Sequence, residues 1–157
     1  TLGTSMLWLG LAAGSAVVPW WSDKIGKRKL PMILGSAVQL LCMLPMIYME
    51  GMGAGLALLL CFIFGFANSS HMLAFSTAAD VVKPSQIGTS AAIVNGIMFI
   101  AGGILMNRPG ARIGLGIDAG IEPASLALVR YAGMPLIIAL ALALVLSFII
   151  KETFPKK

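Results

Sequence analysis

Few ionisable side chains lie within the long apolar segments of this sequence, and His71 is the one set well inside a segment. A histidine titrates near physiological pH, so at membrane depth it can bind a substrate or carry a proton. Asn68 and Phe75 stand three residues before it and four residues after it, which places all three side chains on one face of a helix. These three residues are candidates for a cavity. The alternative is a neutral histidine that only bonds a neighbouring helix.

Asn95 is a second polar candidate, near the middle of the fourth apolar segment and beside Gly96. Its amide can face the same cavity as His71, or it can clamp two helices together. An interhelical hydrogen bond within a membrane contributes only about 0.6 kcal/mol on average. Both interpretations of Asn95 stay open from the sequence.

The charged residues gather in short turns, and the turn that runs from Asp23 to Lys29 is the most specific of them. Gly26 permits a sharp reversal of the chain. Asp23 lies near the C-terminal end of the preceding helix, where the helix dipole disfavours a carboxylate, so it needs a partner. Arg28 offers carboxylates a planar guanidinium, and we expect it to contact Asp80 at the end of another segment. The alternative is a solvated basic turn that only sets topology.

Patterns typical of an enzyme or a metal site do not accompany these candidates. His71 is the only histidine, and Cys42 and Cys61 both fall inside apolar runs, so no metal-ligand cluster is expected. The glycines from Gly114 to Gly120 have the wrong spacing and flanking segments for a nucleotide-binding loop. The sequence predicts no Ser-His-Asp set and no carboxylate pair at membrane depth. We therefore expect no catalytic residue, no metal and no cofactor.

The composition defines the class of protein that must position these side chains. Hydrophobic residues make up 59% of the 157 residues and charged residues only 11%, whereas soluble domains carry about 25% charged residues. A soluble domain of this size could not cover its surface with so few polar groups. The formal net charge of +5 comes from basic residues in short turns, so it does not indicate nucleic-acid binding. The composition predicts a polytopic membrane protein.

Five segments are apolar and long enough to cross a hydrocarbon core of about 30 Å, which takes about 20 helical residues. Only helices fit such segments, because open sheet edges cannot face lipid. We predict an all-α membrane bundle whose longest loop, at 107–125, is rich in glycine and contains two prolines. Small residues at helical spacing in the fourth segment predict close packing against another helix: Gly88, Ala92, Gly96 and Gly103. The five predicted spans cover about 2–21, 30–49, 53–79, 87–106 and 126–150.

The basic residues also predict the orientation of the bundle. Eight of the eleven lysines and arginines lie at one set of span ends, at 22–29, 80–86 and 151–157. The other side holds only Arg108, Arg112 and Arg130. Because cytoplasmic loops carry the excess of basic residues, we expect the first set in the cytoplasm and the C-terminus inside.

The order Asp23-Lys-Ile-Gly26-Lys-Arg28-Lys29 between two spans resembles the cytoplasmic-loop signature of major facilitator superfamily transporters. That signature occurs between the second and third helices of the family and, in weaker form, between the eighth and ninth. Four spans follow it here, as they would follow the second copy. The stretch from Gly88 to Gly96 is similar to the eleventh helix of many members. Pro19 stands where the family has its first glycine.

This resemblance implies that the chain covers helices eight to twelve of a twelve-helix carrier. Its partners would be the lipid bilayer, a small-molecule substrate and the N-terminal bundle of the same carrier. Asp23, Gly26, Arg28 and Asp80 would form a cytoplasmic gating motif, while Asn68, His71, Phe75 and Asn95 would line the substrate cavity. The layout places Gln39 outside that cavity, which favours a packing role for it.

The function that the resemblance implies is secondary transport of a small solute by alternating access, as a symporter or an antiporter. The membrane would be the inner membrane of a bacterium. The main alternative is a five-span structural or assembly subunit of a membrane complex. An intramembrane enzyme is the third possibility, and the missing catalytic patterns argue against it.

Overall fold

The computed structural model describes residues 1–155, and over that range every regular element is helical. The predicted all-α class is confirmed, and five helical units within these residues are long and apolar enough to be candidate membrane spans. The elements in chain order are α1 (Leu2–Ile25), α2 (Lys29–Tyr48), α3 (Ala54–Asn68), η1 (Ser69–Met72), α4 (Leu73–Asp80), η2 (Pro84–Gln86), α5 (Ile87–Asp118) and α6 (Leu126–Ile149).

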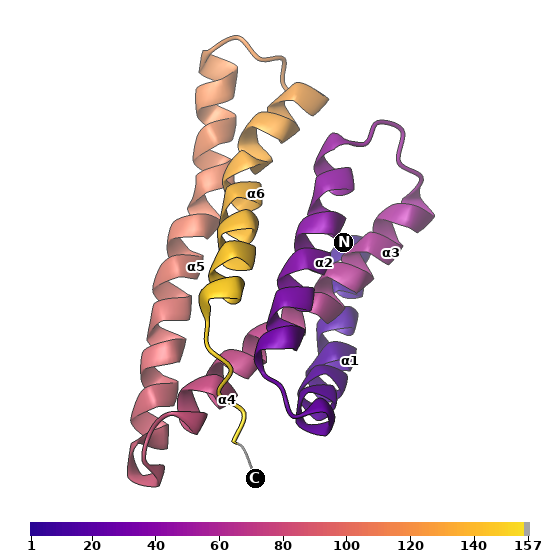
Figure 1. Ribbon diagram of the computed structural model, residues 1–157. Helices are drawn as coiled ribbons and strands as arrows, with labels where there is room; N and C mark the ends of the chain where they lie inside the picture. Colours follow the sequence, from indigo (N-terminus) through magenta and orange to yellow (C-terminus); the bar gives the residue numbers. More distant parts are fainter. Residues whose placement is uncertain (156–157) are drawn as a thin grey trace.

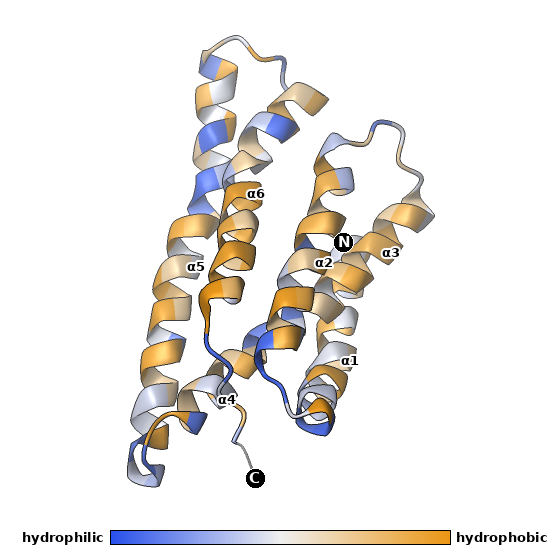
Figure 2. Ribbon diagram, viewed as in Figure 1, coloured by the Kyte–Doolittle hydropathy of each residue, from blue (hydrophilic) through white to orange (hydrophobic). Residues whose placement is uncertain are grey.

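The helices form two groups that lie side by side (Figure 1). One group holds α1, α2 and α3, and the other is the hairpin of α5 and α6. Contacts between α2 and α6 join the groups, and α4 crosses beneath them to reach the lower part of α5. Apolar residues dominate the middle of the helices, while the hydrophilic residues collect in the turns and along the upper part of α5 (Figure 2).

Glycines let α1, α2 and α3 approach one another at backbone distance. A Cβ atom added to Gly10 would lie 2.1 Å from the carbonyl oxygen of Phe62, and one added to Gly65 would lie 2.0 Å from that of Leu7. Gly14 meets the backbone of α3 one turn further along. Gly10 and Gly14 stand four residues apart on α1, the spacing typical of closely packed membrane helices. This pair was not among the packing positions predicted from the sequence.

The small residues of the fourth span do not pack in this way, so that prediction was wrong within the described chain. An added Cβ would meet nothing within 4 Å at Gly88, Gly96 or Gly103, and Ala92 is exposed. These residues lie on α5, where Gly116 alone is buried. Phe99 and Met106 on the same helix are 74% and 85% exposed. The small residues therefore face open space instead of a helix of this chain.

The predicted loop at 107–125 was also wrong over most of its length, because α5 continues to Asp118 and only 119–125 connect it to α6. Pro109 and the glycines weaken a helix locally, and contacts with α6 outweigh that weakness. The Nε of Arg112 donates to the backbone oxygen of Tyr131 at 2.7 Å, and its guanidinium lies 3.9 Å from the centre of the Tyr131 ring. Gly116 packs on Leu128 and Tyr131. At 32 residues, α5 is roughly 48 Å long.

The third span is bent instead of straight, since the 3-10 turn η1 separates α3 from α4. Polar side chains at this point bond to backbone carbonyls that, in a straight α-helix, would accept from the N–H group four residues later. The Ser69 hydroxyl donates to the carbonyl of Phe66 at 2.7 Å, and the His71 ring bonds the carbonyl of Asn68. Side chains that bond their own backbone compete with the helix and favour such breaks. Four consecutive polar residues, Asn68 to His71, thus lie at this break, within the third candidate span.

Candidate functional site

Arg28 lies in the turn between α1 and α2 and reaches the end of α4. That turn is at the lower end of the bundle in Figure 1. The Nε of Arg28 donates to Asp80 at 3.2 Å, and one Nη forms an ion pair with Asp23 at 2.5 Å. The same Nη donates to the hydroxyl of Ser22 at 3.2 Å. We name these four residues, Ser22, Asp23, Arg28 and Asp80, the Arg28 cluster. The contact that the sequence led us to expect between Arg28 and Asp80 is thus present in the structure.

The two ion pairs differ in their access to water. The side chains of Arg28 and Asp80 are 12% and 14% exposed, whereas that of Asp23 is 61% exposed. An ion pair in water contributes little, because solvent and salt screen it. A shielded pair leaves an uncompensated charge when one partner is lost. The pair between Arg28 and Asp80 is therefore the one that holds the cluster together.

The turn after α1 explains how Arg28 reaches both carboxylates. The helix runs to Ile25, four residues beyond the predicted end at position 21, so Ser22 and Asp23 belong to its last turn. Gly26 has a φ of +63°, and the N–H groups of Gly26 and Lys27 donate back to the carbonyls of Asp23 and Ser22. A glycine takes this left-handed conformation without the cost that a Cβ imposes. The chain then reverses at once, and Arg28 points back along α1.

The segment after α6 closes the cluster from the other side, which the sequence did not reveal. The carboxylate of Glu152 accepts hydrogen bonds from the backbone N–H groups of Arg28 and Lys29, at 2.7 Å and 3.2 Å. It thereby caps the N-terminus of α2, whose first N–H groups have no partner within the helix. The ring of Phe154 lies 4.9 Å from the Arg28 guanidinium, and Thr153 donates to Asp80 at 3.4 Å.

The electrostatics of Glu152 reflect these contacts. Burial alone would raise the pKa of its carboxyl group, but the backbone N–H donors of Arg28, Phe154, Lys29 and Thr153 outweigh it and hold the pKa below its ordinary range. Glu152 therefore stays ionised and holds the segment after α6 to the start of α2.

The opposite end of the bundle carries a second, more exposed ion pair. An Nη of Arg130 on α6 lies 3.0 Å from Glu50 in the turn after α2, and it also donates to the backbone oxygen of Tyr48 at 3.0 Å. Glu50 is 74% exposed at its side chain. The Nε of Arg130 is buried and has no hydrogen-bond partner among the described residues. This contact joins the two helix groups at the end away from Arg28.

The candidate cavity residues are only partly brought together. Asn68 and His71 line a partly open cavity of about 290 Å³, to which α2, α3, η1, α4, α5 and α6 contribute side chains. Phe75 is half-buried outside its lining, and Asn95 is exposed on α5. Gln39, for which the family layout favoured a packing role, also lines this space. We name this space the polar cavity, and its polar lining consists of Ser36, Gln39, Asn68, Ser70, His71 and Ser147.

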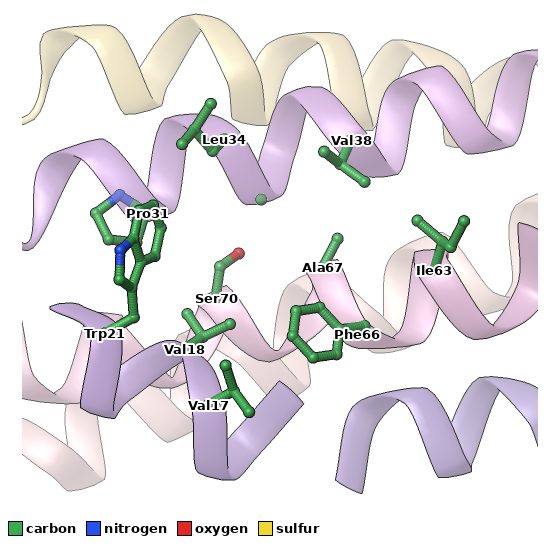
Figure 3. Close-up of a pocket in the computed structure, with 11 residues that line it drawn as sticks. Val17, Val18, Trp21, Pro31, Leu34, Val38, Ile63, Phe66, Ala67 and Ser70 are labelled. Atoms are coloured by element: carbon green, nitrogen blue, oxygen red, sulfur yellow. The ribbon is translucent and has the colours of Figure 1, made fainter. Parts of the chain in front are cut away.

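A second cavity, of about 300 Å³, lies between α1, α2 and α3 and is almost wholly apolar. Figure 3 shows Trp21 and Pro31 at one end of it and Val38 and Ile63 at the other. Ser70 supplies the one hydroxyl group in its lining, and Ser70 also lines the polar cavity. The η1 break thus separates an apolar space from a polar one.

The described residues contain no group of three or more histidine, cysteine or acidic side chains that could hold a metal ion. Compared with protein families, curated proteins and solved structures, the chain shows no match. The resemblance to the major facilitator superfamily therefore stays a prediction, as do the gating and cavity roles of the individual residues. What composition and structure establish is an all-α integral membrane protein with five candidate spans.

Proposed function

We propose that this chain is part of a secondary transporter that moves a small solute by alternating access, and that the Arg28 cluster is a latch in that movement. The observation that carries the proposal is the pair of contacts by which Arg28 bridges the end of α1 and the end of α4. A turn that only set topology would need basic residues, but not two carboxylates on different spans that share one guanidinium.

The elements around the latch fit a conformational change. Asp80 ends α4, and α4 is joined to α3 only through the 3-10 break η1. A 3-10 segment within a long helix often marks a hinge. Loss of the contact between Arg28 and Asp80 would free the end of α4 to move about η1. The glycine contacts between α1 and α3 would hold the remainder of that group rigid.

The side of the membrane follows from the placement of the basic residues. The excess of lysine and arginine at the Arg28 end supports a cytoplasmic position for that end. A closed latch would then seal the cytoplasmic side while the carrier faces outward. In the twelve-helix arrangement that the sequence resembles, a second bundle would supply the other wall of the solute path.

Solute exchange tests this proposal. Liposomes that hold the product of the whole reading frame are loaded with one unlabelled solute class at a time, from amino acids, sugars, nucleosides and carboxylates. We expect labelled solute of one class to exchange across the membrane. Arg28→Ala should slow that exchange at least tenfold. Lys27→Ala removes a positive charge from the same turn without touching either carboxylate, and it should exchange nearly normally.

A second function, an assembly subunit of a membrane complex, is favoured by one observation. The apolar and small residues of α5 are exposed along most of the helix, so a further protein could cover them. If no solute class exchanges and the protein purifies in fixed ratio with another membrane protein, the assembly function replaces the transport function.

A further inference from the structure

The polar cavity has an unequal supply of hydrogen-bond donors and acceptors. Four of its polar side chains are Ser36, Gln39, His71 and Ser147, and each bonds a backbone carbonyl three or four residues earlier. The distances are 2.8 Å, 3.3 Å, 2.5 Å and 2.6 Å in that order. A carbonyl oxygen can only accept, so each side chain must donate its hydrogen there.

The hydroxyl hydrogens of Ser36 and Ser147 and the Nδ1 hydrogen of His71 are therefore engaged, whereas Gln39 keeps the second N–H of its amide. The acceptors of all four side chains remain free. The serine hydroxyls keep their lone pairs, the Gln39 amide keeps its oxygen, and the His71 ring keeps Nε2 as an acceptor. Asn68 and Ser70 also line the cavity and can adapt to either role. An occupant that satisfies the free acceptors of Ser36, Gln39, His71 and Ser147 must bring hydrogen-bond donors.

The end of α6 adds a preference for positive charge. Ser147 and Ile150 line the cavity, and α6 ends at Ile149, so the cavity lies at the C-terminus of this helix. The unpaired carbonyls there carry partial negative charge. The ammonium of Lys29 already donates to one of them, that of Phe148, at 2.7 Å.

The rest of the lining favours an organic cation over a metal ion. Half of the lining residues are apolar, among them Met32, Met98 and Leu146, and these suit an alkyl body. Hard metal cations prefer oxygen ligands, whereas the free Nε2 of His71 is a good acceptor for an N–H donor. A volume of about 290 Å³ lies near the lower limit of small-molecule pockets, which is roughly 300 Å³.

We propose that the polar cavity binds a small organic ammonium ion. Its N–H groups donate to Gln39, His71 and Ser147, and its alkyl part packs on Met98 and Leu146. This proposal concerns binding alone. It holds whether the chain serves a transporter or an assembly, so failure of solute exchange does not decide it.

Calorimetric titration of the purified protein in phosphatidylcholine nanodiscs tests the proposal with n-butylammonium chloride as the probe. Butyltrimethylammonium has the same charge without N–H donors, and n-butanol has a donor without the charge. We expect saturable binding of butylammonium, with both analogues at least about tenfold weaker. Equal binding of any analogue, or a response to sodium chloride without one to butylammonium, overturns the proposal.

Variants of the lining give an independent test. Gln39→Leu removes an acceptor and should weaken butylammonium binding about tenfold or more. Gln39→Glu adds a carboxylate at the same place and should tighten binding, which a misfolded protein cannot do. Ser90→Ala on α5 is the matched control for Ser36→Ala, because both hydroxyls donate to their own helix and only Ser36 lines the cavity. A Gln39→Glu protein that binds no more tightly than the unchanged protein overturns the proposal.

Discussion

Arg28 holds parts of the chain that lie far apart in sequence, through one guanidinium and one backbone N–H group. The guanidinium contacts Asp23 on α1 and Asp80 on α4, and the N–H group donates to Glu152 after α6. Removal of Asp80 and removal of Asp23 should therefore lower the free energy of unfolding by different amounts, because the two carboxylates differ in burial. Asp80 is 14% exposed and Asp23 is 61% exposed.

Asp80→Asn is expected to lower the free energy of unfolding by about 1–3 kcal/mol, because it leaves a shielded guanidinium without its counter-charge. Asp23→Asn should lower the free energy of unfolding by less than about 1 kcal/mol, since water can take the place of this exposed carboxylate. Thermal unfolding of the two variants in the same detergent measures the difference. Equal losses would show that burial does not separate the two ion pairs.

The pH dependence of the segment after α6 follows from Glu152. Its pKa is lowered in the folded protein, so its contribution to stability is complete above the ordinary glutamate value of about 4.3. That contribution is lost as the pH falls through the lower, folded-state pKa. Glu152→Gln should therefore be less stable than the unchanged protein at pH 7, and the gap in unfolding temperature should close in strongly acidic solution. A gap that stays constant with pH contradicts the assignment.

At this scale, the sequence predicted the contact between Arg28 and Asp80, which lie 52 positions apart. The proximity of Arg28 to Asp80 followed from two charges that needed partners at the same membrane boundary. The contact of Glu152 joins residues 124 positions apart, and no periodicity in the sequence indicates where the segment after α6 folds back. Gln39 was assigned to packing because a family layout, and not its own chemistry, placed it.

The helices themselves differ in how they use their small residues. Three glycines on α1 and α3 meet the backbone of the neighbouring helix: Gly10, Gly14 and Gly65. On α5, in contrast, Gly88, Gly96 and Gly103 face open space. Replacement of glycine by alanine should therefore have opposite effects on stability at the two kinds of position.

Gly10→Ala should destabilise the protein by about 1–3 kcal/mol, because the added methyl group meets the backbone of α3 at Phe62 and the helices must move apart. Gly96→Ala should be neutral or stabilise the protein by up to about 1 kcal/mol, through the higher helix propensity of alanine. Unfolding midpoints in one detergent measure both. Destabilisation by Gly96→Ala would indicate that a partner covers that face.

Hydropathy was enough to predict five candidate spans, because a candidate is defined by helix length and apolar composition. It did not predict the break at η1 or the extension of α5. Asn68 to His71 are polar side chains that also occur in straight helices, and only their bonds to the backbone produce the turn. Arg112 stabilises the upper part of α5 through Tyr131, a contact with another helix.

The whole bundle leaves much apolar surface uncovered, and a membrane protein can present such a surface to lipid or to protein. If the solute path needs a second bundle, liposomes that hold only residues 1–157 should take up no solute, although the protein inserts. Radiolabelled uptake with a matched empty-liposome control measures this. Robust, saturable uptake by these residues alone would refute the need for a second bundle.

The distance between the ends of α1 and α4 tests the latch most directly. Spin labels at Lys27 and Val81, in a protein with Cys42 and Cys61 replaced by alanine, report that distance in liposomes by pulsed electron resonance. We predict two distance populations, with the shorter one dominant. Arg28→Ala should shift the population to the longer distance, and Lys24→Ala should leave it unchanged. A single distance that Arg28→Ala does not alter would contradict the proposed latch.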